Sequence, residues 1–121
     1  MMVVIGGDSH KRTHTFVVLD EVGRRLANKT VPATTDGHLV ALSWARQWGD
    51  RRWALEDCRH LTRRLEGDLL RAGEAVVRVP PKMMAAERRA TRSPGKSDPI
   101  DAEAVARAAL RDPDLPVARL E

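Results

Sequence analysis

The residues best suited to chemistry include two aspartates three positions apart, Asp98 and Asp101. Pro99 between them is typical of the first position of a helix, where its missing N–H needs no partner. Side chains three apart in a helix lie on one face, so both carboxylates can point the same way from the helix start. The alternative is a capping role, in which Asp accepts hydrogen bonds from the free N–H groups of the first turn.

Two further acids, Asp8 and Glu56, each follow a short apolar run. Residues 3–5 and 53–55 predict buried strands that end just before these acids. If the two strands are parallel neighbours, both acids lie at the edge where open α/β sheets place their sites. The alternative is that Asp8 belongs to a strand-end turn and that Glu56 is a solvated side chain.

The elements that must position these acids can be predicted along the chain. Apolar runs bounded by turn residues predict strands over residues 3–5, 13–19, 25–31, 53–55 and 75–79. Helical spacing, caps and stops predict helices over residues 35–47, 59–72 and 99–111. The expected apolar faces of the first two helices are Val40, Trp44 and Trp48, and Leu61, Leu65 and Leu69.

This order of elements predicts an α/β fold with helices flanking a mixed five-stranded sheet. Short connections among the first three strands indicate an antiparallel meander. Right-handed crossovers then give the strand order 3-2-1-4-5, in which strand 2 is antiparallel and strands 1 and 4 are parallel neighbours. Asp8 and Glu56 should therefore share an edge of the sheet, against which the last helix can lay Asp98 and Asp101.

Composition limits the class of protein. The 121 residues suffice for one domain with a core, and 42% hydrophobic with 31% charged residues is typical of a globular chain. The single Cys58 excludes an internal disulfide and fits a reducing cytoplasm, here expected to be bacterial. No apolar run approaches the roughly 20 residues of a membrane span, and the first residues lack the form of a signal peptide.

In combination, these residues resemble the amino-terminal, RuvC-like domain of DEDD-type insertion-sequence transposases, which has a ribonuclease-H-like fold. The similarity covers nearly the whole chain, so residues 1–121 are expected to form one such domain. It rests on Gly7-Asp8-x-x-Lys11, Glu56 after the fourth strand, Val79-Pro80-Pro81-Lys82, and Gly95-Lys96-Ser97-Asp98-x-x-Asp101-Ala102. The resemblance implies that Asp8, Glu56, Asp98 and Asp101 bind two Mg²⁺ or Mn²⁺ ions and act in DNA cleavage and strand transfer.

Four acids suit this chemistry. Two divalent ions about 3.5–4 Å apart can clamp a scissile phosphate, activating the attacking oxygen and stabilising the leaving one. Mg²⁺ is a hard cation and prefers oxygen ligands such as carboxylates.

The resemblance also implies partners that composition does not reveal. Family members use a structured guide RNA beside DNA, and the full-length protein is expected to be a homo-oligomer. They continue into a second domain that carries a serine nucleophile. Since this chain stops at Glu121, we expect that domain to be absent from it, and Ser9, Ser43, Ser93 and Ser97 do not match its serine.

A basic segment precedes the last helix. Residues 82–96 carry one acid and several cations, and with Lys11 these are expected to contact nucleic-acid phosphate: Lys82, Arg88, Arg89, Arg92 and Lys96. The alternatives are a solvated surface for the segment and a solvated loop lysine for Lys11. Few aromatics occur, so base stacking is not the expected mode. Gly95-Lys96-Ser97 is not a phosphate loop, because Ala90 stands where that motif requires its first glycine.

Three side chains near the acids have ordinary interpretations. His10 and His60 are expected to be exposed loop histidines, and Cys58 a core residue. Two functions then remain for the domain. One is metal-dependent DNA strand cleavage, which the full set of acids favours. The other is a non-catalytic nucleic-acid-binding or assembly module that retains the fold.

Overall fold

A computed structural model describes residues 1–57, 59–90 and 98–120 of the chain. Its elements are β1 (Met2–Ser9), β2 (Thr13–Leu19), β3 (Arg25–Pro32), α1 (Thr35–Ala45), β4 (Asp50–Glu56), α2 (Arg59–Arg71), β5 (Val76–Val79), α3 (Pro81–Ala90) and α4 (Asp98–Arg111). The strands form one sheet in the order β3-β2-β1-β4-β5. Strand β2 is antiparallel to both neighbours, whereas β1, β4 and β5 are parallel. The predicted topology is confirmed.

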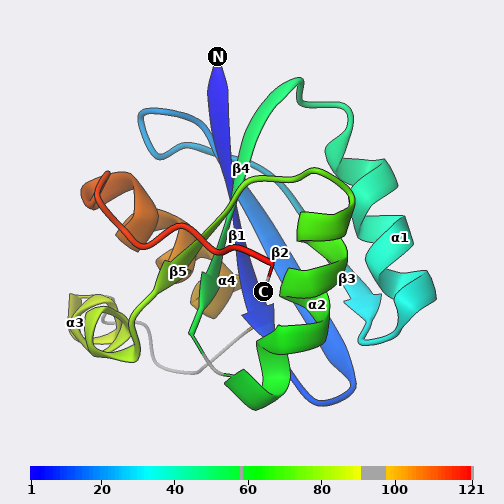
Figure 1. Cartoon of the computed structure of the whole chain (residues 1–121). Coiled ribbons are helices and arrows are strands. Elements are labelled where there is room, and N and C mark those ends of the chain that lie inside the picture. Colours follow the sequence, from blue (N-terminus) through cyan, green and yellow to red (C-terminus); the bar gives the residue numbers. More distant parts are fainter. Residues whose placement is uncertain (58, 91–97, 121) are drawn as a thin grey trace.

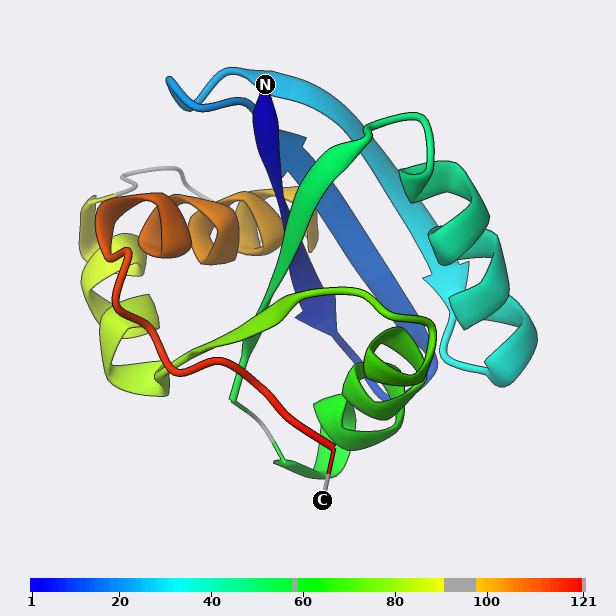
Figure 2. The same ribbon diagram turned by 45° about the horizontal axis from the view of Figure 1, so that its top comes forward.

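Helices cover both faces of this sheet (Figure 1). Figure 2 shows α1 and α2 on one side and α3 and α4 on the other. Each face has its own apolar core because strand side chains alternate between faces. Ile5, Phe16 and Trp53 belong to the core under α1 and α2, whereas Val4 and Val17 belong to the core under α4. Among the described residues, no helix has both the length and the apolar composition needed to cross a membrane.

Helix α4 approaches the sheet very closely at Gly6 of β1. A Cβ atom on Gly6 would overlap the backbone oxygen of Ala102 and lie 2.6 Å from the backbone nitrogen of Ala106. The face of α4 toward the sheet is accordingly rich in small buried residues: Ala102, Ala104, Ala106, Ala108 and Ala109. The missing side chain of Gly6 thus sets the height of α4 above β1.

The predicted apolar face of the first helical segment is only partly confirmed, because Trp44 and Trp48 pack against the core but Val40 does not. The sequence predicted Thr35 or Asp36 as the cap of this helix, but α1 begins at Thr35 with Thr34 as its cap, whose hydroxyl accepts a hydrogen bond from Gly37 N at 3.0 Å. Its buried residues, however, are Gly37, His38, Ala41, Leu42 and Ala45, whereas Val40 is 47% exposed. Close packing selects this face, because a Cβ on Gly37 would overlap the carbonyl oxygen of Pro32.

The second predicted apolar face is partly confirmed. Leu65 and Leu69 of α2 are buried, but Leu61 is 40% exposed and the neighbouring Thr62 is buried instead. Helix α3 was not predicted from the sequence. Pro81 opens that helix, as proline often does at a first helical position, and Met84 is buried in the core beside α4.

Two histidines are buried between β2 and α1. His14 and His38 are each 2% exposed, and their rings stack with centres 5.3 Å apart. Nδ1 of His38 lies 2.6 Å from Oδ2 of Asp68 on α2. Burial, together with the nearby His38 and His10, lowers the pKa of His14 from 6.5 to about 4. His14 is therefore neutral in the folded protein at pH 7.

The stability of the domain is expected to fall as the pH drops from 6.5 toward 4. In this window the unfolded chain binds a proton at His14 and the folded chain does not, so protons favour unfolding. Since each pKa unit corresponds to about 1.4 kcal/mol, we expect a loss on the order of a few kcal/mol across this window. Urea unfolding of wild type and His14→Gln across this range tests the prediction. An equal pH dependence in both proteins would contradict it.

Candidate functional site

Asp8 and Glu56 lie at the same edge of the sheet. The parallel register of β1 and β4 pairs Gly7 with Leu55, so the next residue of each strand is the acid. Glu56 is the last residue of β4, as predicted. Asp8 lies inside β1, where it pairs with Thr15 of β2, and not beyond the strand end as the sequence suggested. Asp8 lies within the strand because Gly6 and Gly7 continue β1 instead of ending it.

Both acids also belong to the same face of the sheet. Asp8 is two residues beyond Gly6, over which α4 lies, and alternation puts the two on one side. Glu56 is two residues beyond Ala54, which packs in the core beneath α4. Asp57, the exposed neighbour of Glu56, does not share this position. Alternation thus brings Asp8 and Glu56 to the face of α4 at the carboxyl ends of β1 and β4.

The start of α4 carries the two remaining acids. Asp98 is the first residue of α4, one position before the predicted start, and its side chain lies outside the described part of the structure. Asp101 is half-buried and directly precedes Ala102, whose backbone lies over Gly6. Gly6 is two residues from Asp8. The first turn of α4 therefore runs close to the part of β1 that carries Asp8.

Asp8 has His10 beside it, a contact that was not predicted from the sequence. Its side chain is 15% exposed, and its Oδ2 lies 2.8 Å from Nε2 of His10. His10 is 47% exposed, so the prediction of an exposed loop histidine is confirmed while its contact was missed. The spacing was the available signal, because residues two apart at a strand end can lie on one side. His60 is exposed on α2, and Cys58 lies outside the described residues.

These acids suit a hard divalent cation in donor type, since each supplies carboxylate oxygens. Within residues 1–57, 59–90 and 98–120, no three His, Cys, Asp or Glu side chains are grouped so that they could hold a metal ion. That set does not include the side chain of Asp98. What the fold assembles is a pair of strand-end carboxylates with the start of α4 beside them.

Only some of the predicted basic residues belong to the part of the chain that the structure describes. Lys11 is exposed in the turn between β1 and β2, and Lys82 is exposed in the first turn of α3. Arg88 and Arg89 belong to α3, but their side chains are not described. Arg92 and Lys96 lie outside the described residues. Helix α3 packs against α4, the helix that begins with Asp98.

Comparison with known proteins identifies both a family and a fold. A family model for DEDD transposases of the IS110 type, described as "Transposase", matches residues 5–120. The structure of Thermus thermophilus RuvC in complex with a Holliday junction substrate is similar, with a TM-score of 0.67, 17% identity, and coverage of 98% of this chain and 100% of that chain. A second structure of Thermus thermophilus RuvC gives a TM-score of 0.67 and 17% identity, covering 97% and 100%.

No curated protein sequence matches this chain. The structural similarity confirms the predicted fold, a mixed five-stranded sheet of the ribonuclease-H-like, RuvC-like type.

Proposed function

Because this chain belongs to the family of DEDD transposases, we propose that it is the domain that cuts and transfers DNA strands in a metal-dependent reaction. The family and the RuvC-like fold support a role in DNA cleavage and recombination. In the proposal, Asp8, Glu56, Asp98 and Asp101 hold two divalent ions, Mg²⁺ or Mn²⁺.

One observation carries this proposal. Asp8 and Glu56 lie near the carboxyl ends of neighbouring parallel strands on the face covered by α4, and the first turn of α4 carries Asp98 and Asp101. These elements, far apart in the chain, direct the four acids toward the edge where open α/β sheets bind ligands, which supports the proposal. A capping role alone would explain the two acids of α4, but it would not explain the acids of β1 and β4.

Each residue has a distinct task in the proposed reaction. Asp8 is central, because β1 lies between β2 and β4, and its carboxylate would be a metal ligand. Glu56 would hold one side, and the acids of α4 would close the site from the helix face. His10, at 2.8 Å from Asp8, would orient that carboxylate through Oδ2. When bound, the cations would activate the attacking oxygen and stabilise the leaving oxygen of the scissile phosphate.

DNA is the proposed substrate. The similar RuvC structure holds a Holliday junction, which is a DNA substrate of that protein. For this chain the exposed Lys11 and Lys82 offer phosphate contacts beside the acids. The family resemblance adds a structured guide RNA, and a homo-oligomer of the full-length protein, to the proposal.

Cleavage of supercoiled and branched DNA in Mg²⁺, Mn²⁺ and EDTA tests the function. Wild-type protein should nick DNA only with a divalent ion, and Glu56→Gln should not. Asp57→Asn removes a charge from the adjacent exposed residue and should behave as wild type. Cleavage that persists in EDTA, or that Glu56→Gln leaves unchanged, would refute the proposal.

A second candidate is a non-catalytic nucleic-acid-binding or assembly module. It is favoured by the finding that, within the described residues, no three metal-ligating side chains form a group. This candidate predicts DNA binding without nicking, and binding that is indifferent to divalent ions.

The basic segment is expected to bind phosphate without regard to sequence. Replacing Arg88 and Arg89 of α3 by alanine should weaken DNA binding and flatten its salt dependence by roughly one unit of slope per lost contact. The measurement is affinity against salt concentration by fluorescence anisotropy.

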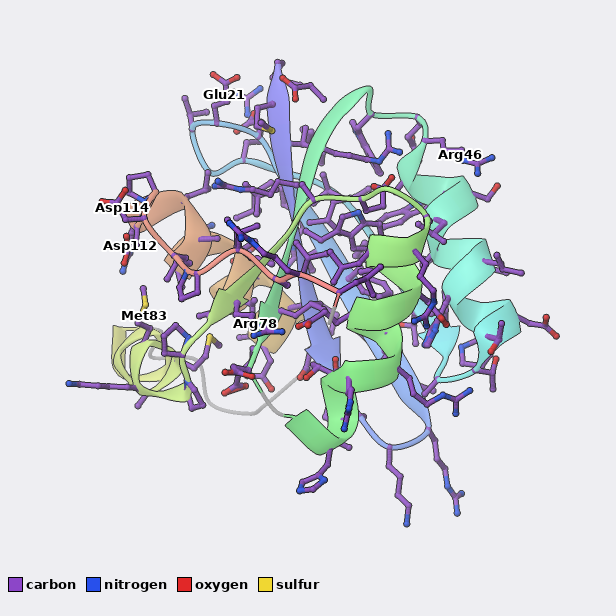
Figure 3. All side chains as sticks on the ribbon, viewed as in Figure 1. Glu21, Arg46, Arg78, Met83, Asp112 and Asp114 are labelled. Atoms are coloured by element: carbon purple, nitrogen blue, oxygen red, sulfur yellow. The ribbon has the colours of Figure 1, made fainter. Side chains whose placement is uncertain are left out.

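A matched control for this prediction removes the same charge elsewhere. Arg46 ends α1 on the far side of the sheet from Met83 of α3 (Figure 3), and Arg24 lies in the turn between β2 and β3. Both are exposed. Arg24→Ala with Arg46→Ala should leave the salt slope unchanged. Equal slopes for the two double variants would mean that the arginines of α3 only contribute net charge.

A further inference from the structure

Four exposed cations lie at the edge of the sheet that carries the two strand-end acids. They are Lys11, Arg12, Arg63 and Arg64. The first two belong to the turn between β1 and β2, and the other two to α2, which begins after β4 with only residues 57 and 58 between them. Figures 1 and 2 both show this turn and the start of α2 beyond the arrowhead of β1. These four side chains make up the α2-side basic surface.

Neighbouring acids do not neutralise this surface. Elsewhere in the domain arginines form ion pairs: Arg25 and Arg107 with Glu103, Arg51 with Glu74, Arg78 with Glu66, and Arg71 with Asp68. The two acids of α2, Glu66 and Asp68, are therefore engaged by other cations. The first turn of α2 carries no acid. Within the described part of the chain, none of the four cations of the surface forms an ion pair.

The composition of the surface indicates which partner would supply the missing negative charge. Three of its four cations are arginines, whose guanidinium fork matches phosphate oxygens. Leu61 of α2 is 40% exposed, but neither the turn nor α2 contains Phe, Tyr or Trp. The aromatic anchors of protein interfaces and of base-stacking sites are therefore missing. What remains is contact with a phosphate backbone, independent of sequence.

Both elements of the surface are held in place before any partner binds. His10 N donates a hydrogen bond to Thr13 O at 3.0 Å, which closes the turn, and Ala33 N donates to Arg12 O at 2.8 Å. Helix α2 is anchored by its buried Leu65 and Leu69. The backbone that carries these cations is thus already ordered, so binding has less conformational entropy to lose.

We propose that the α2-side basic surface binds the phosphate backbone of a nucleic-acid segment that crosses the sheet edge at Asp8 and Glu56. Helices α2 and α3 lie on opposite sides of the sheet (Figure 2). A segment held by this surface and by Lys82 of α3 would therefore pass over the acids between them. The inference rests on the proposed function for the role of that segment as substrate or guide, whereas the contact itself requires no metal.

Affinity measured against salt concentration in EDTA tests this surface. The probes are a DNA duplex and an RNA hairpin, which share the phosphate chemistry. Arg63→Gln with Arg64→Gln, and Lys11→Gln with Arg12→Gln, should each weaken binding and reduce the salt slope by about two units. A loss with the duplex assigns the surface to DNA, and a loss with the hairpin alone assigns it to RNA. Both results support the proposal.

The matched control removes two exposed charges away from this edge. Arg24 lies in the turn at the other end of β2, and Arg46 caps the end of α1. Arg24→Gln with Arg46→Gln changes the net charge equally and should leave the slope unchanged. A fall in the double variants of the surface no larger than in this control, with both probes, would overturn the proposal.

Footprinting of the unaltered protein covers the case in which a variant fails to fold. Bound nucleic acid should protect Arg63 and Arg64 from phenylglyoxal and leave Arg46 reactive. Equal modification of all three arginines with and without either probe would contradict the proposal. Because both measurements are made in EDTA, a failure to cleave DNA leaves their result intact, and an unprotected surface leaves the proposed cleavage intact.

Discussion

Asp8→Asn is expected to abolish metal-dependent DNA cleavage and the stabilisation of the fold by divalent ions. Asp8 is the central acid, so its loss should remove a ligand that the proposed metal site requires. A loss of about 4 kcal/mol of transition-state stabilisation corresponds to roughly a thousandfold slower cleavage. Nicking assays with and without Mn²⁺ measure this effect.

Thermal melts give a second measure that does not require catalysis. A metal that binds only the folded state at a hundredfold excess over its Kd stabilises it by about 2.7 kcal/mol. For a domain of this size the melting temperature should rise by several degrees in wild type and by none in Asp8→Asn. Asp101→Asn should show a reduced rise.

The control for these melts lies next to the acid of β4. Asp57 is exposed, whereas Glu56 shares the sheet face and edge of Asp8. Glu56→Gln should reduce the metal effect and Asp57→Asn should leave it intact. The capping alternative predicts instead that Asp98→Ala destabilises the protein by about 1 kcal/mol equally with and without metal. Wild-type melting that is indifferent to millimolar Mn²⁺ would favour the non-catalytic module.

Gly6→Ala is expected to destabilise the domain by about 3 kcal/mol, the upper part of the range for overpacking. The added Cβ would meet the backbone of α4 at Ala102 and Ala106, and not the flexible end of a side chain. The helix must therefore move away from β1, which opens the alanine-rich core. Urea unfolding measures the loss.

This change should also affect the acids, although it touches none of them. Moving α4 displaces Asp101, which directly precedes Ala102, so the stabilisation by Mn²⁺ should weaken in Gly6→Ala. Gly49→Ala is the matched control, because nothing lies within 4 Å of a Cβ at that exposed position. It should change stability by less than about 0.5 kcal/mol. Equal stability of the two variants would show that α4 tolerates displacement.

The sequence by itself determined the five strands of the sheet, the helices α1, α2 and α4, and the order of these elements. The bounds of β2 were predicted exactly, because a β-rich run there is closed by the turn residues Asp20 to Gly23. The strand order followed from short connections and right-handed crossovers, which depend on local chirality. The shared edge of Asp8 and Glu56 followed in turn, because it requires only that β1 and β4 are parallel neighbours.

Tertiary packing decided the rest. Val40 was expected in the core. The buried face of α1 instead carries small residues such as Gly37, because α1 approaches Pro32 too closely there for a larger side chain. Helix α3 was missed because Met83 and Met84 show no clear period in isolation.

The placement of side chains around each site likewise depended on the folded structure. His10 beside Asp8, and His14 stacked on His38, are contacts of particular strand ends and helix faces. Such contacts depend on strand register, on the height of α4 above Gly6 and on the rotation of α1 about its axis. These are set when two surfaces pack against each other, so no single segment of the sequence contains them.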